Sequence, residues 1–169
     1  MTWRVAAAAA AIAATVSVAP AAASPDAPLP RLEGTWKMRG RIVVAQNLAD
    51  TKVGDRVADT WVFRPVCAAG SCDVRLTRRS QRRAFRLRRK PDSYAGSERY
   101  DGTFVCNGRE YPRASTYITT WVVYVTRSRN GRATAIKGVG GIVGRSPTGL
   151  PCAQIVSQEA VTFTATRSS

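Results

Sequence analysis

Residues 34–44, Gly-Thr-Trp-Lys-Met-Arg-Gly-Arg-Ile-Val-Val, predict the first long strand of an antiparallel sheet. Apolar or small residues occupy one parity of this stretch, and basic residues occupy the other. Such alternation is expected of a strand with one buried face and one wetted face. Trp36 is therefore predicted to be a core residue. The two sets are Trp36, Met38, Gly40, Ile42 and Val44 on one face and Lys37, Arg39 and Arg41 on the other.

The same alternation recurs along the chain and predicts seven further strands. Pro65 marks the end of the second strand, because proline cannot donate to a ladder. Asn-Gly dipeptides at 107–108 and 130–131 predict two tight turns. The densest β signal is 114–126, where almost every residue is β-branched or aromatic. The predicted strands cover residues 56–66, 73–77, 84–88, 94–106, 114–126, 133–143 and 154–167.

Eight strands joined by short connections, with no amphipathic helix after the first 23 residues, predict an all-β domain. A closed, antiparallel up-and-down barrel is favoured, because closure removes the exposed edges that an open sheet must protect. A two-sheet β-sandwich is the alternative. Glycines at 138, 140 and 141 predict a bend in the seventh strand, or a place where another group approaches its backbone. The predicted core residues are Trp36, Trp61, Phe63, Trp121 and Phe163.

The first 23 residues have the pattern of a secretory signal peptide: a short basic start, an Ala-rich apolar run, and small residues before the expected cleavage site. A membrane anchor would need about 20 apolar residues, and this run is shorter. Cleavage after Ala23 leaves 146 residues, the size of one domain. We expect a secreted protein without a transmembrane segment after cleavage. Residues 24–32 are predicted to be an extended, proline-rich lead-in, and residues 33–169 the barrel.

Four cysteines lie after the signal peptide, and an even number in an exported chain predicts two disulfides. Three pairings are possible. We favour Cys67–Cys72 and Cys106–Cys152, because residues 68–71 form a turn that would bring the first two together. No histidine is present, and only one cysteine pair is close in sequence, so the pattern argues against a zinc site.

The mature chain is strongly basic, with 25 Lys and Arg against 11 Asp and Glu, a net charge of +14. This charge predicts attraction to polyanions such as an anionic envelope polymer, acidic lipid head groups or nucleic acid. Composition alone is an alternative explanation, because 22 of the chain's 26 basic residues are Arg and Ala is also abundant, as in a GC-rich genome. Nucleic acid is disfavoured by the predicted export and by the absence of a recognisable nucleic-acid-binding motif.

Nine positive charges are concentrated in residues 75–90. Phe85 and Leu87 alternate with Arg86 and Arg88, so folding would place several guanidinium groups on the outer face of two adjacent strands. Such a patch could bind phosphates. A well-solvated outer face is the simpler interpretation of a charge run. The candidate anion-binding residues are Arg75, Arg78, Arg79, Arg82, Arg83, Arg86 and Arg88.

Gly34-Thr35-Trp36 on the first strand, together with Arg167 on the last, resembles the pattern of lipocalins and other calycins. In that family the tryptophan of a G-x-W motif packs beneath a basic side chain at the closed end of the barrel. The resemblance implies a calycin-like barrel, Arg167 packed near the core, and a small apolar ligand. The spacing W-x-F-x-P-x-C-x4-C-x-V-x-L of residues 61–76 is also similar to exported actinobacterial proteins of unknown function.

The sequence offers little for catalysis. Triads that use histidine are excluded, and a cysteine nucleophile is disfavoured where all four cysteines pair. Two carboxylates would suffice for a glycosidase, but most of the acids lie in turns or beside Arg. Asp59 and Glu159 differ, because their parity places them with core aromatic residues, where they would be paired with Arg or mark the rim of a pocket.

These observations predict a secreted, non-catalytic barrel with no cofactor or metal. We expect it to bind an anionic cell-envelope component or a small amphiphilic ligand. The alternatives are an exported structural or adhesion module without a ligand and a hydrolase that uses Asp or Glu. The barrel interior discriminates among them: a filled core favours a structural role, an apolar cavity favours ligand binding, and two acids in a cleft favour catalysis.

Overall fold

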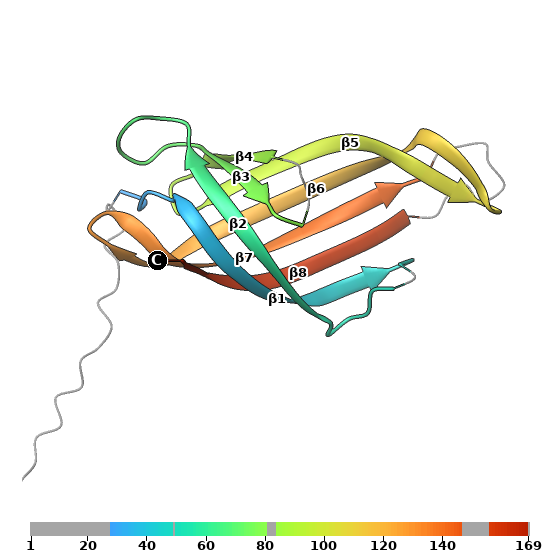
Figure 1. The fold of residues 1–169 in the computed structure, drawn as a ribbon, viewed down its shortest axis with the longest axis horizontal. Coiled ribbons are helices and arrows are strands. Elements are labelled where there is room, and N and C mark those ends of the chain that lie inside the picture. Colours follow the sequence, from blue (N-terminus) through green and yellow to red (C-terminus); the bar gives the residue numbers. More distant parts are fainter. Residues whose placement is uncertain (1–27, 49, 81–83, 147–155, 169) are drawn as a thin grey trace, which may run out of the picture.

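The computed structural model describes residues 28–48, 50–80, 84–146 and 156–168. Eight antiparallel strands each pair with the next, and β8 pairs back with β1, so the sheet closes into a barrel (Figure 1). The predicted eight-stranded, all-β up-and-down barrel is confirmed, and the sandwich alternative is wrong. Within the described residues, no helix is long and apolar enough to cross a membrane. The predicted signal peptide, residues 1–23, lies outside the described residues.

The strand bounds follow the predicted alternation closely. The sixth strand is much longer than predicted, because both Asn-Gly dipeptides form the tight turns that delimit it. Asn107 and Asn130 adopt positive φ, as does the glycine after each. The β5–β6 hairpin consequently extends beyond the rest of the barrel at one end (Figure 1). The strands are β1 Gly34–Gln46, β2 Arg56–Pro65, β3 Val74–Arg78, β4 Ala84–Arg89, β5 Tyr94–Cys106, β6 Arg109–Arg129, β7 Arg132–Arg145 and β8 Val156–Arg167.

We call the end of the barrel at Trp36 the closed end, because the lead-in covers it. Leu29 and Leu32 are buried in the core, and Arg31 forms a parallel bridge with Arg132 at the start of β7. The backbone N–H of Arg31 donates to Gly131 O, and Arg31 O accepts from the N–H of Ala133. Residues 28–32 of the predicted lead-in are thus extended, but they pack onto the barrel as part of its core.

Aromatic side chains fill the closed half of the barrel. All five predicted core aromatics, Trp36, Trp61, Phe63, Trp121 and Phe163, are buried. The Trp61 ring lies 5.1 Å from the Trp121 ring and 4.7 Å from the Phe163 ring, in edge-to-face geometry. This half is therefore packed with side chains and is not hollow.

Glycine in β7 admits these rings. A Cβ at Gly140 would lie 2.0 Å from the Trp121 indole, so only glycine allows the ring to rest against the strand backbone. A Cβ at Gly138 would lie 2.1 Å from the Val122 carbonyl oxygen and 2.6 Å from the Phe163 ring. Close approach of an aromatic ring thus explains Gly140, and close approach of both backbone and ring explains Gly138.

Trp36 and Arg167 are direct register partners on β1 and β8. The Arg167 guanidinium lies against Gly34, where an added Cβ would be 3.0 Å from Nε, and its Nη2 is 3.8 Å from Glu33 Oε1. The Trp36 indole N–H donates to Glu33 O at 3.0 Å. The closed barrel is compatible with a calycin-like architecture.

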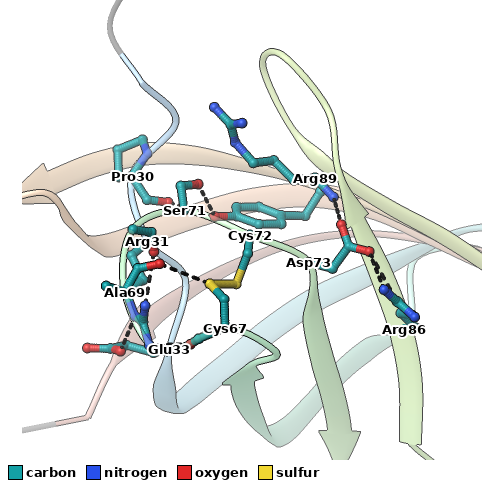
Figure 2. Close-up of a disulfide and its surroundings, with 12 residues drawn as sticks. Pro30, Arg31, Glu33, Cys67, Ala69, Ser71, Cys72, Asp73, Arg86 and Arg89 are labelled. Atoms are coloured by element: carbon teal, nitrogen blue, oxygen red, sulfur yellow. Dashed lines mark hydrogen bonds and ion pairs between the residues drawn. A yellow bond between two sulfur atoms is a disulfide. The ribbon is translucent and has the colours of Figure 1, made fainter.

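Cys67 and Cys72 form a disulfide at the tip of the β2–β3 hairpin, as predicted. Figure 2 shows Arg31 of the lead-in beside this turn. Arg31 donates from Nη1 to Gly70 O and from Nη2 to Cys67 O. Arg31 Nε also donates to Glu33 Oε2 at 2.7 Å, so one guanidinium ties the disulfide turn to the start of β1. Cys106 is buried. Its predicted partner, Cys152, lies outside the described residues.

Candidate functional site

Asp59 on β2 is the only carboxylate within strands β1 to β4, and it faces the barrel interior. Its side chain is 4% exposed. Ser80 Oγ donates to it at 2.6 Å, Arg78 Nε at 3.1 Å and Trp61 Nε1 at 3.2 Å. Burial raises the pKa of this carboxyl, but the hydrogen bonds from the Ser80 and Arg78 side chains and from the Thr60 and Ser80 backbone outweigh burial and lower the pKa below its ordinary value.

Arg78 is the last residue of β3 and shares the inward parity of Val74 and Leu76. Its guanidinium pairs with Asp59 and lies 4.8 Å from the centre of the Trp121 ring. From the sequence, Arg78 was predicted to be an anion-binding residue in the loop between the third and fourth strands. The structure places it inside the barrel, in an ion pair that lies over the aromatic core.

Two further carboxylates have inward parity. Glu98 and Glu159 lie in one interior row, with Thr119 and Ile142 between them on two intervening strands. Measured along the curved sheet, three strand spacings of about 4.8 Å separate their backbones. Among the described residues, no three acids or cysteines gather closely enough to hold a metal ion.

On the outer face, three arginines lie side by side across β2, β3 and β4. Arg64 is opposite Arg75, and Arg75 is opposite Arg86. All three are exposed. We call them, with the exposed Arg88 two residues further along β4, the arginine row. Directly opposite residues in an antiparallel pair have Cβ atoms about 5 Å apart, so neighbouring members of the row are close enough to bind successive charges on a polymer.

One carboxylate borders the arginine row. Asp73, just before β3, accepts the backbone N–H of Arg89 at 2.8 Å, and its Oδ2 lies 2.9 Å from Arg86 Nη2 (Figure 2). The Arg89 N–H is the main cause that lowers the pKa of Asp73, and Arg86 contributes further. In the described part of the chain, Arg64 and Arg75 form no ion pair. The row therefore keeps an excess of positive charge.

The remaining predicted anion-binding residues divide into two groups. Arg79 is exposed just after β3, and its backbone N–H donates to Thr60 O. Arg82 and Arg83 lie outside the described residues. Arg64 was missed from the sequence, although its parity, opposite to that of Phe63, would have placed it on the outer face.

Comparisons supply no further guide to the site. The chain has no significant match among protein-family models, curated proteins or solved structures. Function is therefore inferred from the geometry of the barrel itself.

A second feature of the outer face was not predicted from the sequence. An open groove of about 970 Å³ runs across β2, β1, β8, β7 and β6. Its side chains come from strands that are far apart in sequence. The lining residues include four cations, Arg39, Arg41, Arg56 and Lys137, with Thr162, Thr164 and Tyr124.

Proposed function

We propose that this chain is an exported, non-catalytic barrel that binds an anionic polymer of the cell envelope through the arginine row. The observation that supports the proposal is the register of Arg64, Arg75 and Arg86, which puts three exposed guanidinium groups side by side. Guanidinium groups bind phosphate and carboxylate with two parallel hydrogen bonds, and such charge-assisted bonds are stronger than neutral ones.

The separation of charges across the barrel wall supports the same function. Strands β1 to β4 contain one carboxylate, Asp59, and it is turned inward and satisfied by Arg78 and Ser80. Glu33 is at the closed end, paired with Arg31 and Arg132. The outer wall of these strands consequently presents positive charge that its own acids do not neutralise.

Like charges on directly opposite residues destabilise a sheet, so the arginine row costs the fold free energy. Asp73 offsets this cost only on the β4 side, at Arg86. An anionic polymer lying across the strands would neutralise several guanidinium groups together and release its counterions. The packed aromatic core, by contrast, offers no room for a ligand in the closed half of the barrel.

The test compares two variants that lose the same charge. In one, Arg64, Arg75, Arg86 and Arg88 are all replaced by Gln; in the other, the exposed Arg99, Arg109, Arg127 and Arg129 are replaced instead. Affinity for heparin and for long-chain polyphosphate is measured at one fixed ionic strength. We expect the first variant to bind at least about tenfold more weakly than wild type, since each charge-assisted bond contributes roughly 1.5–3 kcal/mol.

The control variant should lose only a small part of the affinity. Equal losses in the two variants would show that overall charge alone attracts polyanions. A wild-type protein without measurable affinity at physiological salt would favour the structural or adhesion role instead.

A further inference from the structure

We infer that the outer groove is a separate binding site for a single anionic amphiphile, a molecule with a phosphate, sulfate or carboxylate head and one aliphatic chain. The groove and the arginine row share no residue. This inference therefore does not depend on polymer binding, and the two can fail independently.

Two adjacent outward rows of the sheet form the walls of the groove. One row runs from Tyr124 through Lys137, Thr164 and Arg39 to Ala58. The next runs from Val122 through Val139, Thr162 and Arg41 to Arg56. Five strands take part, so the groove extends roughly 19 Å across the sheet.

The head-group end is defined by charge. Arg39, Arg41 and Arg56 come from β1 and β2, and Lys137 lies two strands away on β7. The Thr162 and Thr164 hydroxyls on β8 lie between Lys137 and the β1 arginines. No carboxylate lines this groove, and within the described residues none of the four cations forms an ion pair. A single anionic head could therefore receive hydrogen bonds from both sides.

The groove is also lined by apolar groups with outward parity. Tyr124 and Val139 are 38% and 42% exposed, and Ala58 lies beside Arg39. Between the two outward rows the lining includes the bare backbone of Gly40 and Gly138, whereas the Val57 and Phe163 side chains have inward parity. A fully hydrated inorganic anion would leave Tyr124 and Val139 uncovered.

An apolar track leads away from the cations toward the other end of the barrel. A second hollow of about 200 Å³ adjoins the groove, sharing Val139 in its lining. Val139 is 42% exposed, and Ile118, in the lining of the second hollow, is 37% exposed. The one carboxylate of this lining belongs to Glu159, which has the inward parity of Val161. Other residues of the track are Val122, Gly141, Val143 and Ala160.

Charge at one end and apolar surface at the other match the two parts of an amphiphile. Burial of each methylene on the track should strengthen binding, by roughly two- to fourfold per methylene depending on how much of it is covered. The head should add affinity that weakens as salt rises.

The experiment titrates the mature protein with octyl, decyl and dodecyl phosphate below their micelle-forming concentrations, using calorimetry. Inorganic phosphate tests the head alone, and dodecyl maltoside tests the tail without a charge. We expect saturable binding of one alkyl phosphate, tighter with each added pair of methylenes, and much weaker binding of both reference compounds. Equal affinity for inorganic phosphate, or for dodecyl maltoside, would overturn the inference.

Two variants assign the site. Replacing Arg39, Arg41 and Lys137 by Gln should lower the affinity for dodecyl phosphate at least about tenfold. In the matched control, Arg99, Arg109 and Arg127 are replaced by Gln, and the affinity should change by less than about threefold. Val139→Ser should reduce the increase in affinity that each added methylene gives. It should leave the affinity for inorganic phosphate unchanged. If the triple variant does not fold, Lys137→Gln, at an exposed position, replaces it, with a smaller expected loss.

An equal loss in the triple variant and its control would contradict the inference, because the groove would then contribute only net charge. Binding to vesicles rich in anionic phospholipid, without binding of monomeric dodecyl phosphate, would also contradict it. That result would indicate that the outer wall docks on a membrane surface.

Discussion

Arg75 and Arg78 lie on the same five-residue strand, β3, but face opposite sides of the barrel wall. Arg75 is exposed between Arg64 and Arg86, whereas Arg78 points inward to Asp59 and Trp121. Three positions along a strand reverse the face, because side chains alternate with a period of two. The two arginines therefore have different roles. Arg78 stabilises the barrel interior, whereas Arg75 would stabilise the proposed complex with a polymer.

Arg78→Gln should lower the free energy of unfolding by roughly 2 kcal/mol, because it leaves a buried carboxylate without its charged partner. Arg75→Gln should change it by no more than about 0.5 kcal/mol, as exposed substitutions usually do. Urea denaturation of both variants measures the difference. Similar stabilities for the two proteins would contradict the opposite placement of these side chains.

Trp36→Ala should cost about 3–5 kcal/mol, since the indole is fully buried at the closed end and its N–H donates to Glu33 O. Such a loss threatens a domain of ordinary stability. Tyr124→Ala, at an exposed aromatic residue, is the control and should have little effect. A Trp36→Ala protein with the wild-type melting temperature would refute the role of Trp36 in the core.

Acid should destabilise the barrel through Asp59 and Glu33, whose pKa values are both lowered in the folded state. For Glu33 the main cause is the hydrogen bond from Arg31; for Asp59 the hydrogen bonds from Ser80 and Arg78 outweigh burial. A lowered folded pKa stabilises the protein above the unfolded-state pKa, and that stability is lost as pH falls through the folded pKa. The losses should begin near the ordinary values of 4.5 and 3.8.

Asp59→Asn tests this explanation of acid sensitivity. The variant should be less stable than wild type at pH 7, and the difference should shrink between pH 5 and pH 2, measured by denaturant titration at each pH. A difference that stays constant over this range would show that Asp59 titrates alike in the folded and unfolded chains.

Peptide mapping without reduction should find no free thiol and should recover Cys67 joined to Cys72 and Cys106 joined to Cys152. In the chain-entropy model the first bond closes a very short loop and contributes about 2 kcal/mol, and the second closes a loop of about 46 residues and contributes about 4 kcal/mol. Two reactive thiols in the secreted protein would rule out the second bond.

The alternation of side chains made most of the fold predictable. Trp36, Trp61 and Phe163 could be assigned to the interior because parity alone decides the face of a strand. Both Asn-Gly turns were predicted, but the start of β6 was not, because Pro112 and Arg113, the latter with positive φ, interrupt the alternation between Arg109 and Ala114. Arg78 was misplaced because the predicted third strand ended one residue too early, at Thr77, which put Arg78 in a loop.

The outer sites depend on register, which one strand's sequence does not contain. Arg64 joins Arg75 only when β2 and β3 are paired in the observed alignment. The groove depends on two pairings, because Arg39 and Lys137 come to lie on either side of β8 only when β8 pairs with both β1 and β7 as the barrel closes. The charge run at residues 75–90 therefore predicted the surface that contains the arginine row. It gave no indication of the basic groove, whose cations are scattered along the sequence.

The salt dependence of polymer binding is the most direct measurement of how many arginines of the row contact the polymer. The logarithm of the association constant for polyphosphate falls linearly with the logarithm of salt concentration, with a slope set by the number of cations that contact the chain. For the variant with Arg64, Arg75, Arg86 and Arg88 replaced by Gln, we predict a slope shallower than wild type by about three. For the variant with Arg99, Arg109, Arg127 and Arg129 replaced, we predict a change of less than about one. Equal changes of slope in the two variants would contradict binding through the arginine row.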